Sequence, residues 1–324
     1  MREDTLMVQP FDNRRLDLTG QPVPVAERIS DGRAFSASAN GVLVFQRKPD
    51  PDRQLTWYDH EGKVVGTAGA PGNYQGLALS PDGMRAALDK GSLGQASSIW
   101  LLDLSSGTST RFVFGSASDN NSVSSPDGSR IIFSSNRDGH YNLYRKLASG
   151  EKEEEILLRS SEDKFPTSWS PNGRFLLYTV HDPKTKDDIW VLPLEGDRKP
   201  VSFASTEFGE QNARFSPDGH WVAYASDESG RDEVYVRSFS MNSAGTAVEA
   251  GGRWLISNSG GAEPRWRGDG RELYYHNIYD GRLTAVEIVT APVFRAGTPR
   301  PLGLVFPIDR GTPWDPAADG KRFS

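Results

Sequence analysis

The sequence contains no cysteine, and this absence excludes several kinds of chemistry. Without cysteine there is no disulfide, no thiolate nucleophile and no cysteine-ligated metal. Both reducing and oxidising compartments are compatible with a cysteine-free chain, so this absence does not place the protein in the cell.

Long apolar runs, basic excess and a secretory leader are also lacking. No window approaches the roughly 18 consecutive apolar residues of a membrane-spanning helix. The residues Met1-Arg2-Glu3-Asp4 lack the basic and apolar regions of a secretory signal, so an export signal would lie outside this sequence. The net charge of -6 and the pI near 5.5 argue against nucleic-acid binding, which needs clustered Lys and Arg. We therefore expect no membrane span within the chain and no nucleic-acid partner.

Catalytic motifs are missing as well. There is no Gly-x-Ser-x-Gly nucleophile elbow, no phosphate-binding loop and no His-Glu-x-x-His pair. The five histidines are scattered along the chain, and the acidic run Glu151-Lys152-Glu153-Glu154-Glu155 is typical of a solvated loop. We therefore expect no catalytic residue, no metal, no cofactor and no enzymatic activity in this chain.

A recurring turn is the dominant feature that is present. It reads Ser-Pro-Asp-Gly or Ser-Pro-Asn-Gly in its four strongest copies and is weaker in three others. The turn glycines are Gly41, Gly83, Gly128, Gly173, Gly219, Gly270 and Gly320, which are 42 to 51 residues apart. A period of this size with strand-like sequence on both sides predicts an all-β propeller built from repeated blades.

Each repeat contains material for four short strands. An apolar run follows each turn, as in Arg130-Ile131-Ile132-Phe133, and the turn with its flanks predicts a hairpin. A third strand recurs as Ile-Trp or Val-Tyr, for example at Ile189-Trp190, and a glycine turn then leads to a more polar fourth strand. The aromatic residues recur in step with the repeat, so we expect them to pack between blades, and we expect each turn Asp to be a turn former.

The repeat spacing predicts a single propeller over residues 1–324. We expect seven blades, with residues 28–311 forming six internal blades. Residues 1–27 would supply strands three and four of a closing blade, and residues 312–324 its first strands. A six-bladed ring, or a fragment of a longer array, is the alternative, because the chain stops within a strand at Phe323-Ser324.

The loops that lead into the innermost strands of a propeller gather around its central channel. By repeat alignment, this rim includes amides, both signs of charge and aromatic rings, a mixture suited to a peptide or a polar small molecule. The candidate ligand- or partner-binding residues are Arg33, Tyr74, Gln75, Asn120, Lys164, Phe165, Glu210, Gln211, Glu263 and Trp314. The alternative is that these residues only solvate the channel mouth.

The hairpin Ser-Pro-Asp-Gly followed by Ser135-Asn136-Arg137-Asp138-Gly139 and an Ile/Leu-Trp/Tyr strand resembles the TolB-type, WD-like propeller repeat over nearly the whole chain. Four segments further resemble the C-terminal propeller of bacterial transmembrane serine/threonine protein kinases. They are Thr5 to Asp12, Leu55 to Asp59, Glu162 to Pro166 and Ser216 to Ser229. The resemblance implies an extracytoplasmic, periplasmic or cell-surface module, although no kinase motif is present.

Three functional hypotheses remain open from the sequence. The first is a non-catalytic ligand-sensing or protein-binding propeller of a kinase-like receptor. The second is an accessory propeller that gates substrates for a prolyl oligopeptidase-type peptidase. The third, for which the rim offers no coherent ligand set, is a propeller hydrolase or lyase with a metal in its channel.

Overall fold

A computed structural model describes the chain over residues 6–12, 14–15, 17–26, 35–37, 43–45, 53–91, 96–183, 185–242, 246–249, 251–291, 293–306 and 314–324. All regular elements in these ranges are β-strands. The chain forms two compact units, residues 1–53 and residues 54–324, and each is described by itself.

The first unit contains short strand pairs. Strand β1 (Leu6–Val8) pairs with β4 (Val23–Ala26), and β2 (Phe11–Asp12) pairs with β3 (Asp17–Leu18). Strand β5 (Phe35–Ala37) pairs with β6 (Leu43–Phe45) on either side of the weak first copy of the turn. That turn, with Gly41, lies outside the described residues, as does Arg33 of the predicted rim.

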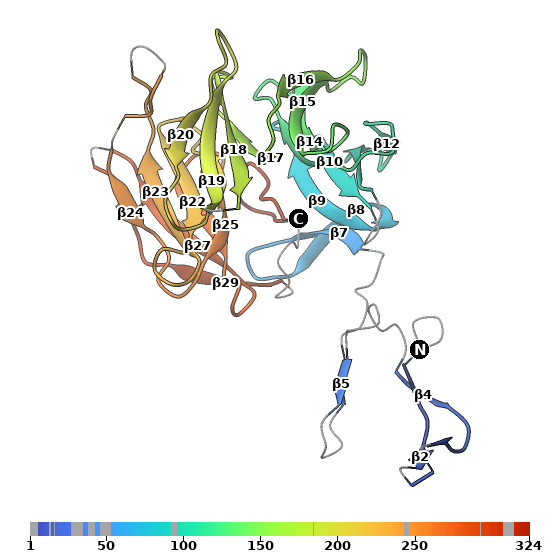
Figure 1. Ribbon diagram of the computed structural model, residues 1–324. Coiled ribbons are helices and arrows are strands. Elements are labelled where there is room, and N and C mark those ends of the chain that lie inside the picture. The colour runs from blue at the N-terminus through green and yellow to red at the C-terminus, as the bar shows by residue number, and fades with distance from the viewer. Residues whose placement is uncertain are drawn as a thin grey trace. The chain divides into compact units, whose positions relative to one another are not determined.

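The second unit is a propeller whose antiparallel blades follow one another along the chain (Figure 1). Blade 1 comprises β9 (Tyr74–Leu79), β10 (Arg85–Lys90), β11 (Ser98–Asp103) and β12 (Ser109–Arg111). Blade 2 comprises β13 (Asp119–Ser124), β14 (Arg130–Ser135), β15 (Asn142–Leu147) and β16 (Glu155–Leu158). Blade 3 comprises β17 (Asp163–Trp169), β18 (Phe175–Asp182), β19 (Lys186–Pro193) and β20 (Val201–Ala204).

Blade 4 comprises β21 (Glu210–Phe215), β22 (Trp221–Ser226), β23 (Glu233–Ser238) and β24 (Arg253–Leu255). Blade 5 comprises β25 (Ala262–Trp266), β26 (Glu272–His276), β27 (Arg282–Val289), β28 (Arg295–Ala296) and β29 (Arg300–Val305), the last two both pairing with β27. The first strands β9, β13, β17, β21 and β25 contact one another in turn, so they surround the axis of the propeller. The last strands, such as β12, β16 and β24, lie at the periphery (Figure 1).

The propeller therefore has five blades, and the expected count of seven is wrong, as is the alternative of six. Two pairings explain the difference. Strands β1 to β4, which were expected to complete a closing blade with the C-terminal segment, pair with one another. The C-terminal segment instead bridges Tyr58 through Phe323, with hydrogen bonds of 2.8 and 2.9 Å between their backbones.

Tyr58 belongs to β7 (Arg53–Tyr58), which forms a hairpin with β8 (Val64–Gly72). One apolar cluster joins this junction to blade 5 and includes Trp314, Phe323 and Tyr274. Another cluster joins the hairpin to blade 1 through Leu55 and Leu88. Packing on both sides of the β7–β8 hairpin thus links blade 5 to blade 1.

The Ser-Pro-Asp-Gly turns form as predicted. In the turn of blade 2 the Ser125 hydroxyl donates to Asp127 at 2.5 Å, and the Gly128 N–H donates to the Ser125 carbonyl at 2.8 Å. Gly128 has a φ of 67°, a left-handed conformation that favours glycine. Hydrogen bonds from the Ser125 hydroxyl and from the Ser129 backbone and hydroxyl hold the pKa of Asp127 down to about 2. The turn Asp is therefore a turn former, as expected from the sequence.

The recurring aromatic residues also lie where the repeat predicts. Tyr178, Tyr224, Tyr274, Phe133 and Trp266 are all buried, and separate apolar clusters lie between consecutive blades. Burying one such ring contributes roughly 2–3 kcal/mol. Stability thus comes from packing between blades, and the channel at their centre is left to polar side chains.

Candidate functional site

A cavity of about 190 Å³ lies between the first strands of all five blades, and we call it the ring cavity. Each blade contributes the residue seven positions before its turn glycine. We call these the ring positions, and they are Gly76, Asn121, Pro166, Asn212 and Glu263. The repeat therefore brings one residue per blade to the same cavity.

Irregular pairing of the first two strands directs these residues to the cavity. In blades 2, 4 and 5 the register shifts at the ring position, and Asn121, Asn212 and Glu263 have φ values of 54°, 58° and 52°. Non-glycine residues rarely adopt this left-handed conformation, and such strain gathers at functional sites. Bulges beside a site re-aim side chains, so three equivalent bulges around one cavity favour a binding role.

Two arginines, Arg214 and Arg265, line the ring cavity together with two carboxylates. Arg265 forms an ion pair with Asp315, with 3.3 Å between Nε and Oδ1. Arg214 has no ion-pair partner among the described residues, and its Nη1 donates to the carbonyl oxygen of Thr167 in blade 3. Burial, with the nearby Arg265 charge, lowers the pKa of Arg214 to about 9.

The carboxylates near these arginines are already engaged. Glu263 accepts a hydrogen bond of 3.0 Å from the Trp314 indole, and Asp315 accepts one of 3.0 Å from the Leu79 backbone. Asp89 accepts one of 2.8 Å from the Asn121 backbone, and burial raises its pKa to about 7. Of the two arginines in this wall, Arg265 is therefore the one in an ion pair, and Arg214 forms none among the described residues.

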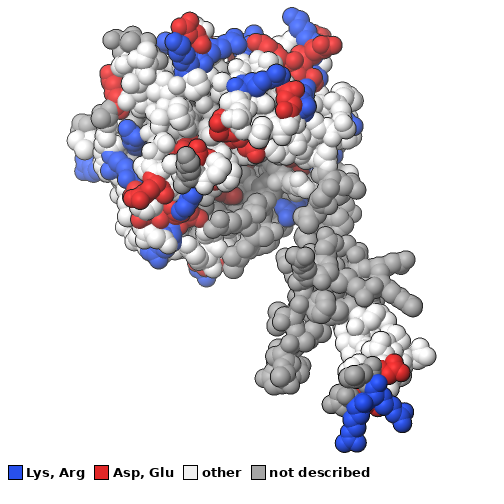
Figure 2. Space-filling view, in the orientation of Figure 1, with Lys and Arg blue, Asp and Glu red and all other residues white. Residues whose placement is uncertain are grey.

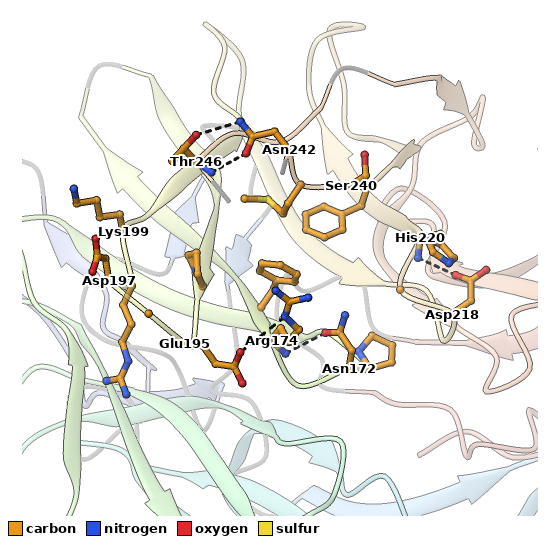
Figure 3. A pocket seen from close by; sticks show the side chains of 18 residues that line it. Asn172, Arg174, Glu195, Asp197, Lys199, Asp218, His220, Ser240, Asn242 and Thr246 are labelled. Atoms are coloured by element: carbon orange, nitrogen blue, oxygen red, sulfur yellow. Dashed lines mark hydrogen bonds and ion pairs between the residues drawn. The ribbon is translucent and has the colours of Figure 1, made fainter. Parts of the chain in front are cut away.

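A larger hollow, of about 1070 Å³, opens between blades 3 and 4 at the turn side of the blades; we call it the inter-blade groove. Its wall includes Phe175 and Phe239, and charged turn residues surround it (Figure 3). Arg174 reaches Glu195 at 4.0 Å, and the Asn172 side chain accepts a hydrogen bond of 3.0 Å from the Arg174 backbone. The labelled side chains of Asn172, Asp218 and Asn242 each accept a hydrogen bond from the backbone of their own turn (Figure 3).

The structure places the predicted rim residues of the five blades within the first three residues of the first strands, whereas Trp314 lies outside the named strands. Gln75 and Glu263 line the ring cavity. Gln75 is exposed and donates to the Gly91 carbonyl at 2.9 Å. Asn120 and Gln211 are half-buried, directly before ring positions, and Asn120 Oδ1 has no hydrogen-bond partner in the described part of the chain.

The other predicted rim residues pack into the protein. Tyr74, Lys164, Glu210 and Trp314 are buried, and Phe165 is half-buried with its ring centroid 5.3 Å from that of Tyr141. Burial lowers the pKa of Lys164, whose Nζ donates to the Glu162 carbonyl. Burial also raises the pKa of Glu210, which accepts a hydrogen bond from the Thr206 hydroxyl. Trp314 contacts the cavity wall through its hydrogen bond to Glu263.

Sequence reasoning did not assign the ring positions Gly76, Pro166 and Asn212, or the two arginines, to the site. The signal that would have found them is distance from the turn glycine. The ring positions lie seven residues before it, and Arg214 and Arg265 lie five before it. The predicted set falls mostly one or two residues earlier because the bulges move the cavity-facing residue along the strand.

In the described residues, no group of three His, Asp or Glu side chains is placed to hold a metal ion. The same part of the chain has no helix long and apolar enough to cross a membrane. On the face shown in Figure 2, acidic and basic side chains are interspersed, with no large area of one sign.

Comparison with known proteins agrees with this architecture. Residues 58–199 match the family model of the PD40, TolB beta propeller domain. A curated relative, the uncharacterized protein Atu1656 of Agrobacterium fabrum, is 30% identical over 154 residues, which cover 45% of this chain and 52% of that protein. The chain thus spans about half the length of this relative.

Solved structures show the same fold at low sequence identity. A protein assigned as TolB from Agrobacterium tumefaciens has a TM-score of 0.62 and 18% identity, over 85% of this chain and 97% of that one. TolB from Acinetobacter baumannii has a TM-score of 0.56 and 17% identity, over 76% and 64% of the two chains. The periplasmic gluconolactonase of Pseudomonas aeruginosa has a TM-score of 0.53 and 14% identity, over 94% of each chain. The fold of residues 54–324 is a TolB-like β-propeller.

Proposed function

We propose that this chain is a non-catalytic binding propeller that takes a ligand or a partner's side chains in its ring cavity. The observation that carries the proposal is the set of equivalent bulges that turn Asn121, Asn212 and Glu263 toward one cavity. A strained conformation at three matching positions costs about 1–3 kcal/mol each, and packing does not require it. Recognition of a bound group provides a reason for it.

The composition of the cavity supports binding rather than catalysis. The polar side chains around it are amides, hydroxyls, arginines and carboxylates, and no histidine, lysine or tyrosine lines its described wall. Glu263 already accepts a hydrogen bond from Trp314. The raised pKa of Asp89 is explained by its burial. Such a wall can orient a polar ligand but offers no paired nucleophile and base.

We further propose that the propeller is the extracytoplasmic part of a kinase-like receptor. The segment resemblance to kinase-associated propellers supports this role, and the structural likeness to a periplasmic gluconolactonase fits the same compartment. The coding sequence on either side of this chain tests the role directly. A kinase domain followed by a membrane helix upstream is the expected result, and a downstream hydrolase domain would contradict it.

The binding role is tested by capture with the full chain as bait. We expect one or more cell-surface or secreted components to be retained by the wild type and released by the double substitution Asn121→Ala and Asn212→Ala. The matched control is Asn172→Ala in the inter-blade groove, which should retain them. Equal retention by both variants would place recognition elsewhere, and turnover of a retained small molecule would contradict the non-catalytic assignment.

A further inference from the structure

Arg214 lines the ring cavity and forms no ion pair of its own among the described residues, although the charges of Asp315 and Glu263 act on it. Its Nε atom is inaccessible to solvent and has no hydrogen-bond partner among the described residues. The neighbouring carboxylates are engaged elsewhere, Asp315 by Arg265 and Glu263 by Trp314. Taking an unpaired guanidinium out of water costs several kcal/mol, so in the unliganded protein this residue opposes folding.

A second polar group in the same cavity lacks a partner. The hydroxyl of Thr167 is buried, with 9% of the residue exposed, and it makes no hydrogen bond within the described chain. Its own backbone carbonyl accepts the bond from Arg214 Nη1, so the two residues are neighbours across blades 3 and 4. Buried polar groups in folded proteins are nearly always hydrogen-bonded, so two such groups on neighbouring residues of one cavity wall favour a role in binding.

The chemistry of the two groups defines that ligand. A guanidinium offers several N–H donors in a planar fork, and a hydroxyl adds one O–H donor beside it. Carboxylate oxygens match this donor set, since they accept charge-assisted hydrogen bonds from both groups. The amides at ring positions 121 and 212 lie in the same wall, where they can bind polar groups of the remaining ligand.

We propose that the ring cavity is a receptor for an organic carboxylate, held by Arg214 and the Thr167 hydroxyl. This assignment rests on the proposed binding role of the cavity and specifies its ligand. The volume of about 190 Å³ is below the roughly 300 Å³ at which drug-sized pockets begin, so the site accepts a small acid or the end of a peptide. Both sources present the same carboxylate to Arg214.

Calorimetric titration of the full chain at pH 7.5 tests the proposal with three probes. They are N-acetylglycylglycine, its C-terminal amide, and succinate. We expect the amide to bind at least about ten times more weakly than the acid, because it lacks the charge. Binding of succinate as well indicates a free small acid, and binding of the peptide acid alone indicates a peptide end. No carboxylate binding at 10 mM of either acid would overturn the proposal.

Substitutions then identify the residues. Arg214→Met should weaken acid binding about 10- to 100-fold, and Thr167→Val about 3- to 10-fold. Arg174→Met in the inter-blade groove is the matched control and should leave binding unchanged. Unchanged binding in folded Arg214→Met would overturn the assignment. If that variant fails to fold, Thr167→Val carries the test alone.

Stability provides an independent readout for Arg214. A structural arginine should lower the melting temperature when replaced, whereas an unpaired buried charge should leave it unchanged or raise it. A falling melting temperature with intact acid binding would make Arg214 structural and would overturn the proposal. In another outcome, the acid and the amide bind equally, and the double substitution Asn121→Ala and Asn212→Ala abolishes binding. That result would refute the carboxylate as the ligand and leave the binding role of the cavity intact.

Discussion

The inter-blade groove and the ring cavity differ in how their polar groups are partnered. The groove encloses about 1070 Å³ against about 190 Å³ for the cavity. Its labelled polar side chains nevertheless hold their own turns, as Asn172 does for Arg174. In the cavity, Arg214 and Thr167 carry orphan groups among the described residues, and three ring positions adopt left-handed conformations. Volume alone would select the groove, whereas unmet hydrogen-bonding capacity selects the cavity.

The largest difference between the two regions should come from Trp314, which is 1% exposed and holds Glu263 at the cavity. Trp314→Ala should lower the free energy of unfolding by about 4 kcal/mol, since it removes a large ring from the cluster that joins blade 5 to β7. Met241→Ala in the groove should cost about 1 kcal/mol, because that side chain is only partly buried. Urea unfolding of both variants checks this prediction. Equal losses of unfolding free energy would show that the two regions do not differ in their contribution to stability.

Two glycines offer the next comparison. A Cβ atom on Gly76 would lie 2.1 Å from Asp89 Oδ2, so Gly76→Ala should cost about 3 kcal/mol through overpacking. Gly219, in the groove, has a φ of 74° and more space, and its nearest neighbour for a Cβ atom would be 3.4 Å away. Gly219→Ala should therefore cost only about 1 kcal/mol of backbone strain. Thermal unfolding measures both, and a larger loss at Gly219 would contradict the tight packing of the cavity wall.

Asp89 should make the cavity wall sensitive to pH. Its folded pKa is raised to about 7 from 3.8, so the stability that the protonated carboxyl contributes is fully present below about pH 4 and is lost as pH rises to 7. Asp89→Asn should remove this loss and stabilise the protein at pH 8 by on the order of 2 kcal/mol. Unfolding curves from pH 4 to 8 test the sign. A variant that is destabilised at pH 8 would show that the carboxylate is needed ionised.

The smallest effect should come from the Arg174–Glu195 pair of the groove. Its atoms are 4.0 Å apart, and the two side chains are 62% and 78% exposed. Arg174→Ala should therefore change stability by less than about 0.5 kcal/mol. Differential scanning calorimetry at low and high salt checks this, and a loss above about 1 kcal/mol would mean that the groove is more tightly organised than its exposure indicates.

The repeat could be predicted from sequence because its signals are local. The side chain of Asp127 and the φ of Gly128 act within one turn, and the hairpin follows from them. The number of blades depends on long-range pairing, in which Phe323 selects Tyr58. No local property of the strand-like residues 6–26 shows that they pair among themselves.

The candidate site required the same long-range information. Arg214 is an ordinary arginine in sequence, and its significance arises because other segments bring Thr167, Glu263 and Asp315 close to it. The bulge at Asn212 is likewise set by how β21 pairs with β22, which shifts the cavity-facing residue from the one that strict alternation indicates. The repeat period predicts where the strands lie, and the bulges determine which side chains face the cavity.

The ring positions are also separate from the residues that stabilise the fold, so the ligand preference can change while the fold is kept. Each lies on its own blade and at a fixed offset from a turn glycine, so one substitution per blade changes one sector of the cavity. A lineage, or an engineer, can exchange Asn121 or Asn212 while leaving the apolar clusters between blades intact. Reading the residue seven positions before each turn glycine in related chains would give their cavity composition directly. The propeller is thus a scaffold on which ligand preference can diverge one blade at a time.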